Sequence, residues 1–311
     1  MPAMLKIVGI FLSFLGALML SLGSLMAKLT QRTTASQINY LAYWFSFIIF
    51  LPVYNCQSRR GHKSGSSVSM KQSAFTAVFL LSHVVSSGCT FAAMQYIKAV
   101  GDVLALCGLY PMWTLLMSRI FLKEKVWIWE LIIALLVIAG VVLIARPSFL
   151  FGGITEPENN DQAIGVVFCL VSSIFTALTI VTAKKLVKND FLSTQMFLSG
   201  IVGIAALFIF LSPLPDQLFV PCLSDMGFVF SGGFFICFSR FFVLTAVRYE
   251  KPGTVMIAYS SQIVVSYLFD ALILRYDLQP LSLLGGALVL SGIIVPIAIK
   301  LKNSRNLDIA N

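Results

Sequence analysis

The segment Gly9 to Lys28 reads GIFLSFLGALMLSLGSLMAK, and the segment Gly165 to Lys184 reads GVVFCLVSSIFTALTIVTAK. Both segments open on glycine and close on Ala-Lys after the same spacing. Each begins a series of five apolar segments, the first series within residues 7–145 and the second within residues 164–299. The chain therefore looks like an internal duplication. Because each copy holds an odd number of spans, the second copy must insert upside down relative to the first, as an inverted repeat.

The composition is that of a membrane protein. Hydrophobic residues make up 58% of the chain and charged residues 11%, whereas a soluble domain is about 25% charged. Spans of about 20 apolar residues cross a hydrocarbon layer about 30 Å thick as helices, and helices satisfy their own backbone groups there. We predict an all-α membrane protein with ten transmembrane helices. The expected spans are 7–27, 38–54, 74–97, 103–122, 126–145, 164–183, 193–211, 226–247, 253–274 and 281–299.

The duplication also divides the chain. We expect a first five-helix repeat over residues 1–150 and a second repeat over 163–311, which ends in a short cytoplasmic tail. Residues 151–162 are predicted to be an external linker between them. This region is rich in glycine, proline and acidic residues, which favours a connection over another helix.

The net charge is +9, and the distribution of the basic residues predicts how the helices are oriented in the membrane. If the N-terminus lies in the cytoplasm, 16 of the 22 basic residues fall on the cytoplasmic side. The positive-inside rule therefore predicts a multi-pass protein with both termini in the cytoplasm, in the plasma membrane or the endoplasmic reticulum. In this setting the positive charge indicates topology and a contact with the lipid bilayer, and no nucleic-acid partner is expected.

The sequence lacks the motifs of common enzyme and metal sites. It has no GxSxG, HExxH or P-loop motif and only two histidines. The six cysteines show no CxxC or Cys/His spacing. We therefore expect no enzyme activity, no catalytic residue, no cofactor and no metal.

Two ionisable side chains lie deep within predicted spans, away from the helix ends, where they are costly and so are functional candidates. Arg240 lies in the span 226–247, and His83 lies near the middle of the equivalent span in the other half. Arg240 offers a charged planar fork for a carboxylate or a phosphate, although it could instead reach towards the interface or pair with protein carbonyls. His83 is either a proton-coupling group or a neutral core histidine.

Neutral polar groups complete the predicted substrate site. Gln262 and Tyr259 lie in the span 253–274, and Tyr110 lies in the counterpart span 103–122. Their side chains can exchange hydrogen bonds with a substrate. Pro111 frees a backbone carbonyl near the bilayer centre and could mark a kink beside a cavity, although prolines are common in membrane helices.

Four charged residues fall at the predicted helix ends, where the interface lowers their cost. They are candidates for a gate or for topology signals. These residues are Asp102, Lys28, Arg119 and Glu124.

The segment 93–124, AMQYIKAVGDVLALCGLYPMWTLLMSRIFLKE, resembles the fourth-helix signature of the drug/metabolite transporter superfamily, EamA type. The second copy departs from it, because Gln262 stands about where a proline is common and Arg275-Tyr276-Asp277 replaces the usual glutamate. The run RYEKPGTVMIAYSSQIVVSYLFD and the ending GGALVLSGIIVP are similar to the G subgroup of solute carrier family 35. The superfamily resemblance implies ten helices in two repeats, and the subgroup implies organic-anion transport and regulation of calcium entry.

Two functional hypotheses follow. The first is a secondary transporter that moves a small polar metabolite, an organic anion, by alternating access of the two halves around a midplane site. The second is a regulatory membrane protein that binds other membrane proteins, such as calcium-entry machinery, through the loop Arg59 to Ser69, with little or no transport. A membrane-protein partner or a homodimer is expected in addition to the small-molecule substrate.

Overall fold

The computed structural model describes residues 3–30, 35–61, 70–96, 106–145, 160–187, 192–211, 225–273 and 280–309. These residues form helices and no strand, so the predicted all-α class is confirmed. The helices are α1 (Ala3–Leu29), α2 (Ala35–Gly61), α3 (Met70–Tyr96), α5 (Tyr110–Phe121), α6 (Ile128–Ala145), α8 (Asn160–Val187), α9 (Leu192–Leu211), α11 (Met226–Tyr249), α12 (Pro252–Tyr259), α13 (Ser261–Ile273) and α14 (Pro280–Ile309).

The outer surface of the bundle is apolar. Within the described residues, four helical segments are long and apolar enough to cross a membrane, namely Ile7–Met26, Ser73–Thr90, Ile164–Leu186 and Met226–Tyr249. Shorter apolar helical segments lie in α6, α9 and α14. Large hydrophobic side chains on the outside stay exposed, for example Leu81 at 64% and Leu272 at 74%. Such a surface is stable in lipid, where exposed apolar groups carry no hydration cost.

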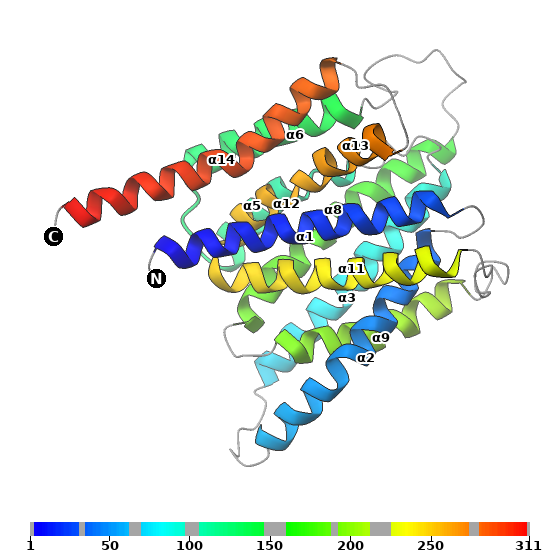
Figure 1. Ribbon diagram of the computed structural model, residues 1–311. Helices are drawn as coiled ribbons and strands as arrows, with labels where there is room; N and C mark the ends of the chain where they lie inside the picture. Colours follow the sequence, from blue (N-terminus) through cyan, green and yellow to red (C-terminus); the bar gives the residue numbers. More distant parts are fainter. Residues whose placement is uncertain are drawn as a thin grey trace.

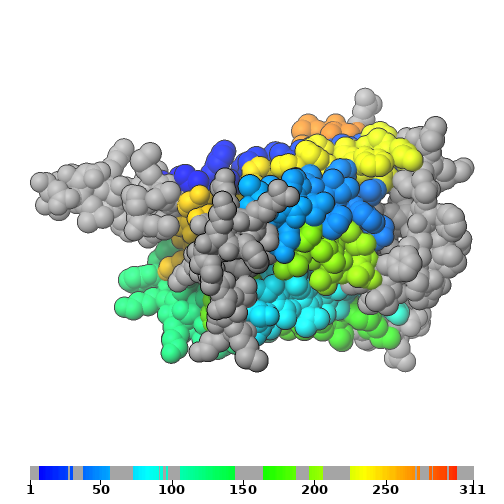
Figure 2. All heavy atoms as spheres, turned by 90° about the horizontal axis from the view of Figure 1, so that it is seen from below, coloured from blue at the N-terminus to red at the C-terminus, as the bar shows by residue number. Residues whose placement is uncertain are grey.

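Helices that are far apart in the sequence pack side by side. The principal pairs are α1 with α11, α3 with α8, α2 with α9, and α6 with α14 (Figure 1). Figure 2 shows α2 beside α9 on one face of the molecule, with α3 next to α9. The short helix α12 lies against α1 and α5, and its residues from Pro252 to Ala258 are all buried. Helix α12 therefore lies in the interior of the bundle, surrounded by other helices.

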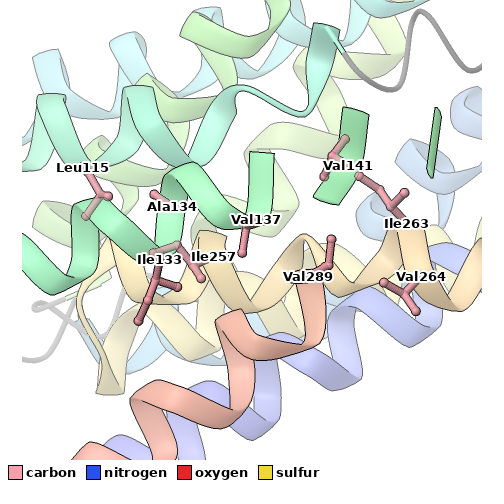
Figure 3. Close-up of a cluster of buried hydrophobic side chains, with 9 residues drawn as sticks. All are labelled: Leu115, Ile133, Ala134, Val137, Val141, Ile257, Ile263, Val264 and Val289. Atoms are coloured by element: carbon pink, nitrogen blue, oxygen red, sulfur yellow. The ribbon is translucent and has the colours of Figure 1, made fainter. Parts of the chain in front are cut away.

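A cluster of buried aliphatic side chains joins α6 and α14 to this central helix (Figure 3). Val137 and Val141 come from α6, Val289 comes from α14, and Ile257 comes from α12. These side chains join α12 to α6 and α14 by apolar packing, which is one of the forces that hold helices together in lipid.

Helix α1 uses two different faces for its two neighbours. Gly9, Gly16 and Gly23 repeat every seven residues and face α11, where a Cβ on Gly16 would lie 2.8 Å from Cγ2 of Val243. On another face, the hydroxyl of Ser13 donates to the Val255 carbonyl at 2.6 Å. Close approach on the glycine face and hydrogen bonds on the serine face hold α1 between α11 and α12.

Two expected spans are interrupted. In the described part of the span 103–122, Leu106 and Cys107 are helical, a turn follows at Gly108 and Leu109, and α5 begins only at Tyr110. Pro111 explains this break, because its ring excludes a helical carbonyl four residues earlier and it has no N–H to donate.

The span 253–274 was predicted as one helix, but it is broken at Ser260 into α12 and α13. No proline is present here. Instead the hydroxyls of Ser260 and Ser261 donate to the carbonyls of Met256 and Ala258, at 3.1 and 2.8 Å. Serine hydroxyls that bond back to the preceding turn compete with the helical backbone pattern and bend helices.

Candidate functional site

The guanidinium of Arg240 lies inside the bundle between α11 and α2. Its Nη2 donates to Oδ1 of Asn39, and its Cζ lies 4.1 Å from the centre of the Tyr43 ring. A cation over a tyrosine face is attracted by the negative ring surface. A second nitrogen, Nη1, is buried and has no hydrogen-bond partner within the described part of the chain.

Tyr43 connects Arg240 to α3. The buried Tyr43 hydroxyl is 2.9 Å from Oγ of Ser87, and its ring meets the His83 ring edge-to-face at 5.6 Å. The other face of His83 stacks with Phe79 at 6.1 Å. The two ionisable residues predicted from the sequence are thus brought together, since both contact the ring of Tyr43.

A second polar group surrounds the two helix breaks. Nε2 of Gln262 donates to the Tyr110 hydroxyl at 3.3 Å, and Oγ of Ser260 lies 3.3 Å from the same hydroxyl oxygen. The Tyr259 hydroxyl is 3.2 Å from Oγ of Ser239, and the rings of Tyr110 and Tyr259 lie 6.3 Å apart. Gln262 Oε1 is buried and lacks a partner among the described residues.

Because Ser239 and Arg240 are consecutive on α11, the two groups are neighbours. We call them together the polar centre, which consists of Asn39, Tyr43, His83, Tyr110, Arg240, Tyr259 and Gln262. Five of the six predicted site residues belong to it. The sixth, Pro111, is buried at the start of α5, next to Tyr110.

Three buried atoms of the polar centre have unused hydrogen-bonding capacity in the described structure. They are Arg240 Nη1, Asn39 Nδ2 and Gln262 Oε1. Buried polar atoms are normally satisfied, so each such exception needs an explanation. Arg240 Nη1 and Asn39 Nδ2 are hydrogen-bond donors, and the arginine carries a positive charge. Gln262 Oε1, which belongs to the second polar group, is an acceptor. Together the three atoms suit a ligand that carries anionic oxygens and a hydrogen-bond donor.

Sequence reasoning missed two members of the polar centre. Asn39 is not among the residues predicted from the sequence, yet it is 6% exposed and bonded to Arg240. Tyr43 was not considered. Both were detectable, because Asn39, Tyr43 and Ser46 recur at spacings of four and three, which place polar groups on one helix face.

Hydroxyl groups hold α3, the helix of His83, against α8. Ser82 bonds to Thr179 at 3.0 Å, and Ser86 is 2.6 Å from Oγ1 of Thr176. Thr90 continues the series farther along α3, bonding to Ser172 at 2.7 Å. Such hydrogen bonds contribute about 0.6 kcal/mol each in a membrane protein.

The predicted gate residues lie apart from the polar centre or outside the described structure. Asp102 is not among the described residues, and the side chain of Lys28 is not described. Arg119 is in the last turn of α5, and Glu124 follows that helix. The pKa of Glu124 is raised above its usual range because burial penalises the carboxylate, and this outweighs the nearby positive charges of Lys184 and Lys251.

We expect Glu124→Gln to raise the melting temperature of the purified protein at pH 7.5 and to have a smaller effect near pH 4.5. The folded state holds the Glu124 proton more tightly than the unfolded state. The resulting stability is complete below the unfolded pKa and is lost as the pH rises through the folded one. Thermal melts of both proteins at the two pH values measure this. A variant that melts lower at pH 7.5 would show that the carboxylate stabilises the fold through Lys184 and Lys251.

The arrangement of helices is shared with known proteins. A solved crystal structure superposes with a TM-score of 0.73 over 92% of this chain and 97% of that chain, at 13% sequence identity, which establishes a common fold. By sequence, human solute carrier family 35 member G1 (Homo sapiens) is 26% identical over 90% of this chain and 76% of its own length. The mouse protein of the same name (Mus musculus) is 27% identical over 84% of this chain and 70% of its own length.

A bacterial protein described as an uncharacterized transporter, from Helicobacter pylori strain J99, is 26% identical over 63% of this chain and 65% of its own length. The family model described as the EamA-like transporter family matches residues 7–146 and again residues 163–297. These two matches cover most of the chain and confirm the resemblance drawn from its sequence. The chain therefore belongs to the EamA-like transporter family and is an integral membrane transporter similar to the G subgroup of solute carrier family 35.

Proposed function

We propose that the protein is a secondary transporter that moves a small organic anion across the membrane by alternating access, with the polar centre as its substrate site. The observation that carries this proposal is the buried, unpartnered Nη1 of Arg240 beside the unpartnered Nδ2 of Asn39. Both atoms are hydrogen-bond donors, and the guanidinium to which one of them belongs carries a positive charge.

The charge balance around Arg240 supports an anionic substrate. Within the described residues, no carboxylate lies within salt-bridge distance of Arg240, whose contacts are the neutral Asn39 and Tyr43. A charge removed from water is stabilised fully only when it is paired. A substrate carboxylate or phosphate supplies that pair, and a hydroxyl or amine on the same molecule reaches Gln262 Oε1.

We also propose that residues 1–150 and 163–311 are inverted repeats joined by residues 151–162. The two matches of one family model support this division. The helix pairs support it as well, because exchanging the halves converts the α1–α11 pair into the α8–α3 pair. The α2–α9 and α6–α14 pairs map onto themselves. Alternating access then consists of a rearrangement of one repeat against the other around the polar centre.

We place both termini in the cytoplasm, with the protein in the plasma membrane or the endoplasmic reticulum. The location of 16 of the 22 basic residues supports this orientation. Antibody access to a C-terminal tag, before and after permeabilisation of the plasma membrane alone, tests it.

An uptake assay with a panel of substrates tests the proposed function. The full chain is reconstituted in vesicles and offered radiolabelled carboxylates, phosphates and neutral analogues at two proton gradients. We expect saturable uptake of at least one anion and none of its neutral analogue. A dependence on the gradient would assign proton coupling, for which His83 is the candidate. Equal uptake of charged and neutral members of every pair would contradict the proposal.

A further inference from the structure

A second candidate site lies at the end of α5, on the molecular surface. The chain between α5 and α6 encloses a groove with a volume of about 460 Å³. The groove is lined by Arg119, Lys123, Glu124, Lys125, Val126 and Trp127. The loop between α5 and α6, which lines the groove, lies at the end of the bundle where α1 begins and α14 ends (Figure 1).

Hydrogen bonds and one salt bridge hold this loop in shape. Glu130, which is 3% exposed, accepts the backbone N–H of Trp127 at 2.9 Å through Oε2. Its Oε1 accepts from Lys251 Nζ at 3.2 Å, and the same ammonium donates to the Lys125 carbonyl at 2.9 Å. A helix-start carboxylate that caps the preceding amide fixes the chain entering α6. The groove is therefore built before any ligand arrives.

The groove has an excess of positive charge that the described part of the protein does not neutralise. Arg119, Lys123 and Lys125 are exposed, and their side chains have no hydrogen bond or ion pair in the described structure. Glu124 is the single acidic residue of the lining. Lys123 adopts the left-handed backbone conformation with φ of 53°, which turns the chain sharply between the other two cations.

An apolar surface adjoins the cations. The side chains of Trp127 and Ile128 are 59% and 77% exposed, and Phe121 at the end of α5 is 52% exposed. Exposed tryptophan next to basic residues at the end of membrane helices is typical of the lipid headgroup level. A soluble anion would use the cations alone, whereas a phospholipid uses both the cations and the apolar surface.

We propose that this groove binds the headgroup of an anionic phospholipid, with the phosphate between Arg119, Lys123 and Lys125 and the acyl chains along the exposed side chains of α5 and α6. The lipid then bridges the two helices on either side of the loop. This site is independent of the substrate site, and its test requires no transport.

The test measures tryptophan quenching in nanodiscs that contain brominated phosphatidylglycerol or brominated phosphatidylcholine. The signal of Trp127 is taken as the difference between the wild type and Trp127→Phe. We expect stronger quenching by phosphatidylglycerol. The preference should fall by about fivefold for each basic side chain replaced by glutamine, at low ionic strength. Arg248→Gln, which removes an exposed arginine at the end of α11, is the matched control and should keep the preference.

Two results would overturn the proposal. The first is equal quenching by the two lipids in the wild type, and the second is an unchanged preference in the triple variant Arg119→Gln/Lys123→Gln/Lys125→Gln. Inorganic phosphate should reduce the preference more than chloride does at equal ionic strength, because it competes with the lipid headgroup for the same three cations. If the triple variant does not fold, the single variant Lys123→Gln tests the same proposal, through a smaller reduction of the preference for phosphatidylglycerol.

Discussion

Replacing Arg240 with glutamine is expected to lower the uptake of the preferred anion by about 100-fold, because removing one partner of a buried charge-assisted pair costs 2 to 5 kcal/mol or more. The guanidinium donates to Asn39 through Nη2, and its Nη1 is left without a partner and can bind the substrate. The measurement is the concentration dependence of uptake in reconstituted vesicles, for the substrate panel described above. The loss should appear mainly as weaker apparent affinity.

Two matched variants separate charge from geometry at this position. Arg240→Lys keeps the charge but loses the planar fork, so we expect partial activity. Arg248→Gln removes an exposed arginine two turns farther along α11 and should leave uptake unchanged. If Arg240→Gln keeps the wild-type affinity for every anionic substrate, Arg240 does not belong to the substrate site.

Gly203→Ala is expected to reduce both thermal stability and uptake, although it changes only one methyl group. A Cβ at Gly203 on α9 would overlap the ring of Tyr43. That ring is fully buried and cannot move aside without disturbing Arg240 and His83. Overpacking of this kind costs about 1 to 3 kcal/mol. We expect a melting temperature lower by a few degrees and apparent substrate affinity about tenfold weaker.

The control for this variant is Gly227→Ala on α11, since a Cβ there would meet no atom within 4 Å. Melting curves and uptake are measured in parallel for the two variants and the wild type. A Gly203→Ala protein that melts lower but binds substrate normally would show that Tyr43 supports the fold and not the site. Equal behaviour of both alanine variants would show that α9 yields to the added methyl group.

The sequence was sufficient to predict the helical fold and several residues of the polar centre, because membrane spans have a distinctive composition in which ionisable residues are rare. A span must be long and apolar, so Arg240 and His83 stood out against their surroundings. Tyr43 did not stand out, because tyrosine is common in membrane proteins and its role comes from contacts with two other helices. The break at Ser260 was missed for a similar reason, since serines break helices far less regularly than proline does.

The sequence by itself determined that the chain is a helical membrane protein of the EamA-like family, because apolar length, charge placement and motif spacing are local properties of the chain. Only the tertiary structure decided which polar side chains meet. Asn39 and Arg240 are 201 residues apart, and Tyr110 and Gln262 are 152 residues apart, yet each pair shares a hydrogen bond. The first contact depends on the packing of α2 against α11. The second depends on the packing of α5 against α12, because the break after α12 places Gln262 at the start of α13. Small residues and helix breaks in distant segments set how closely these backbones approach.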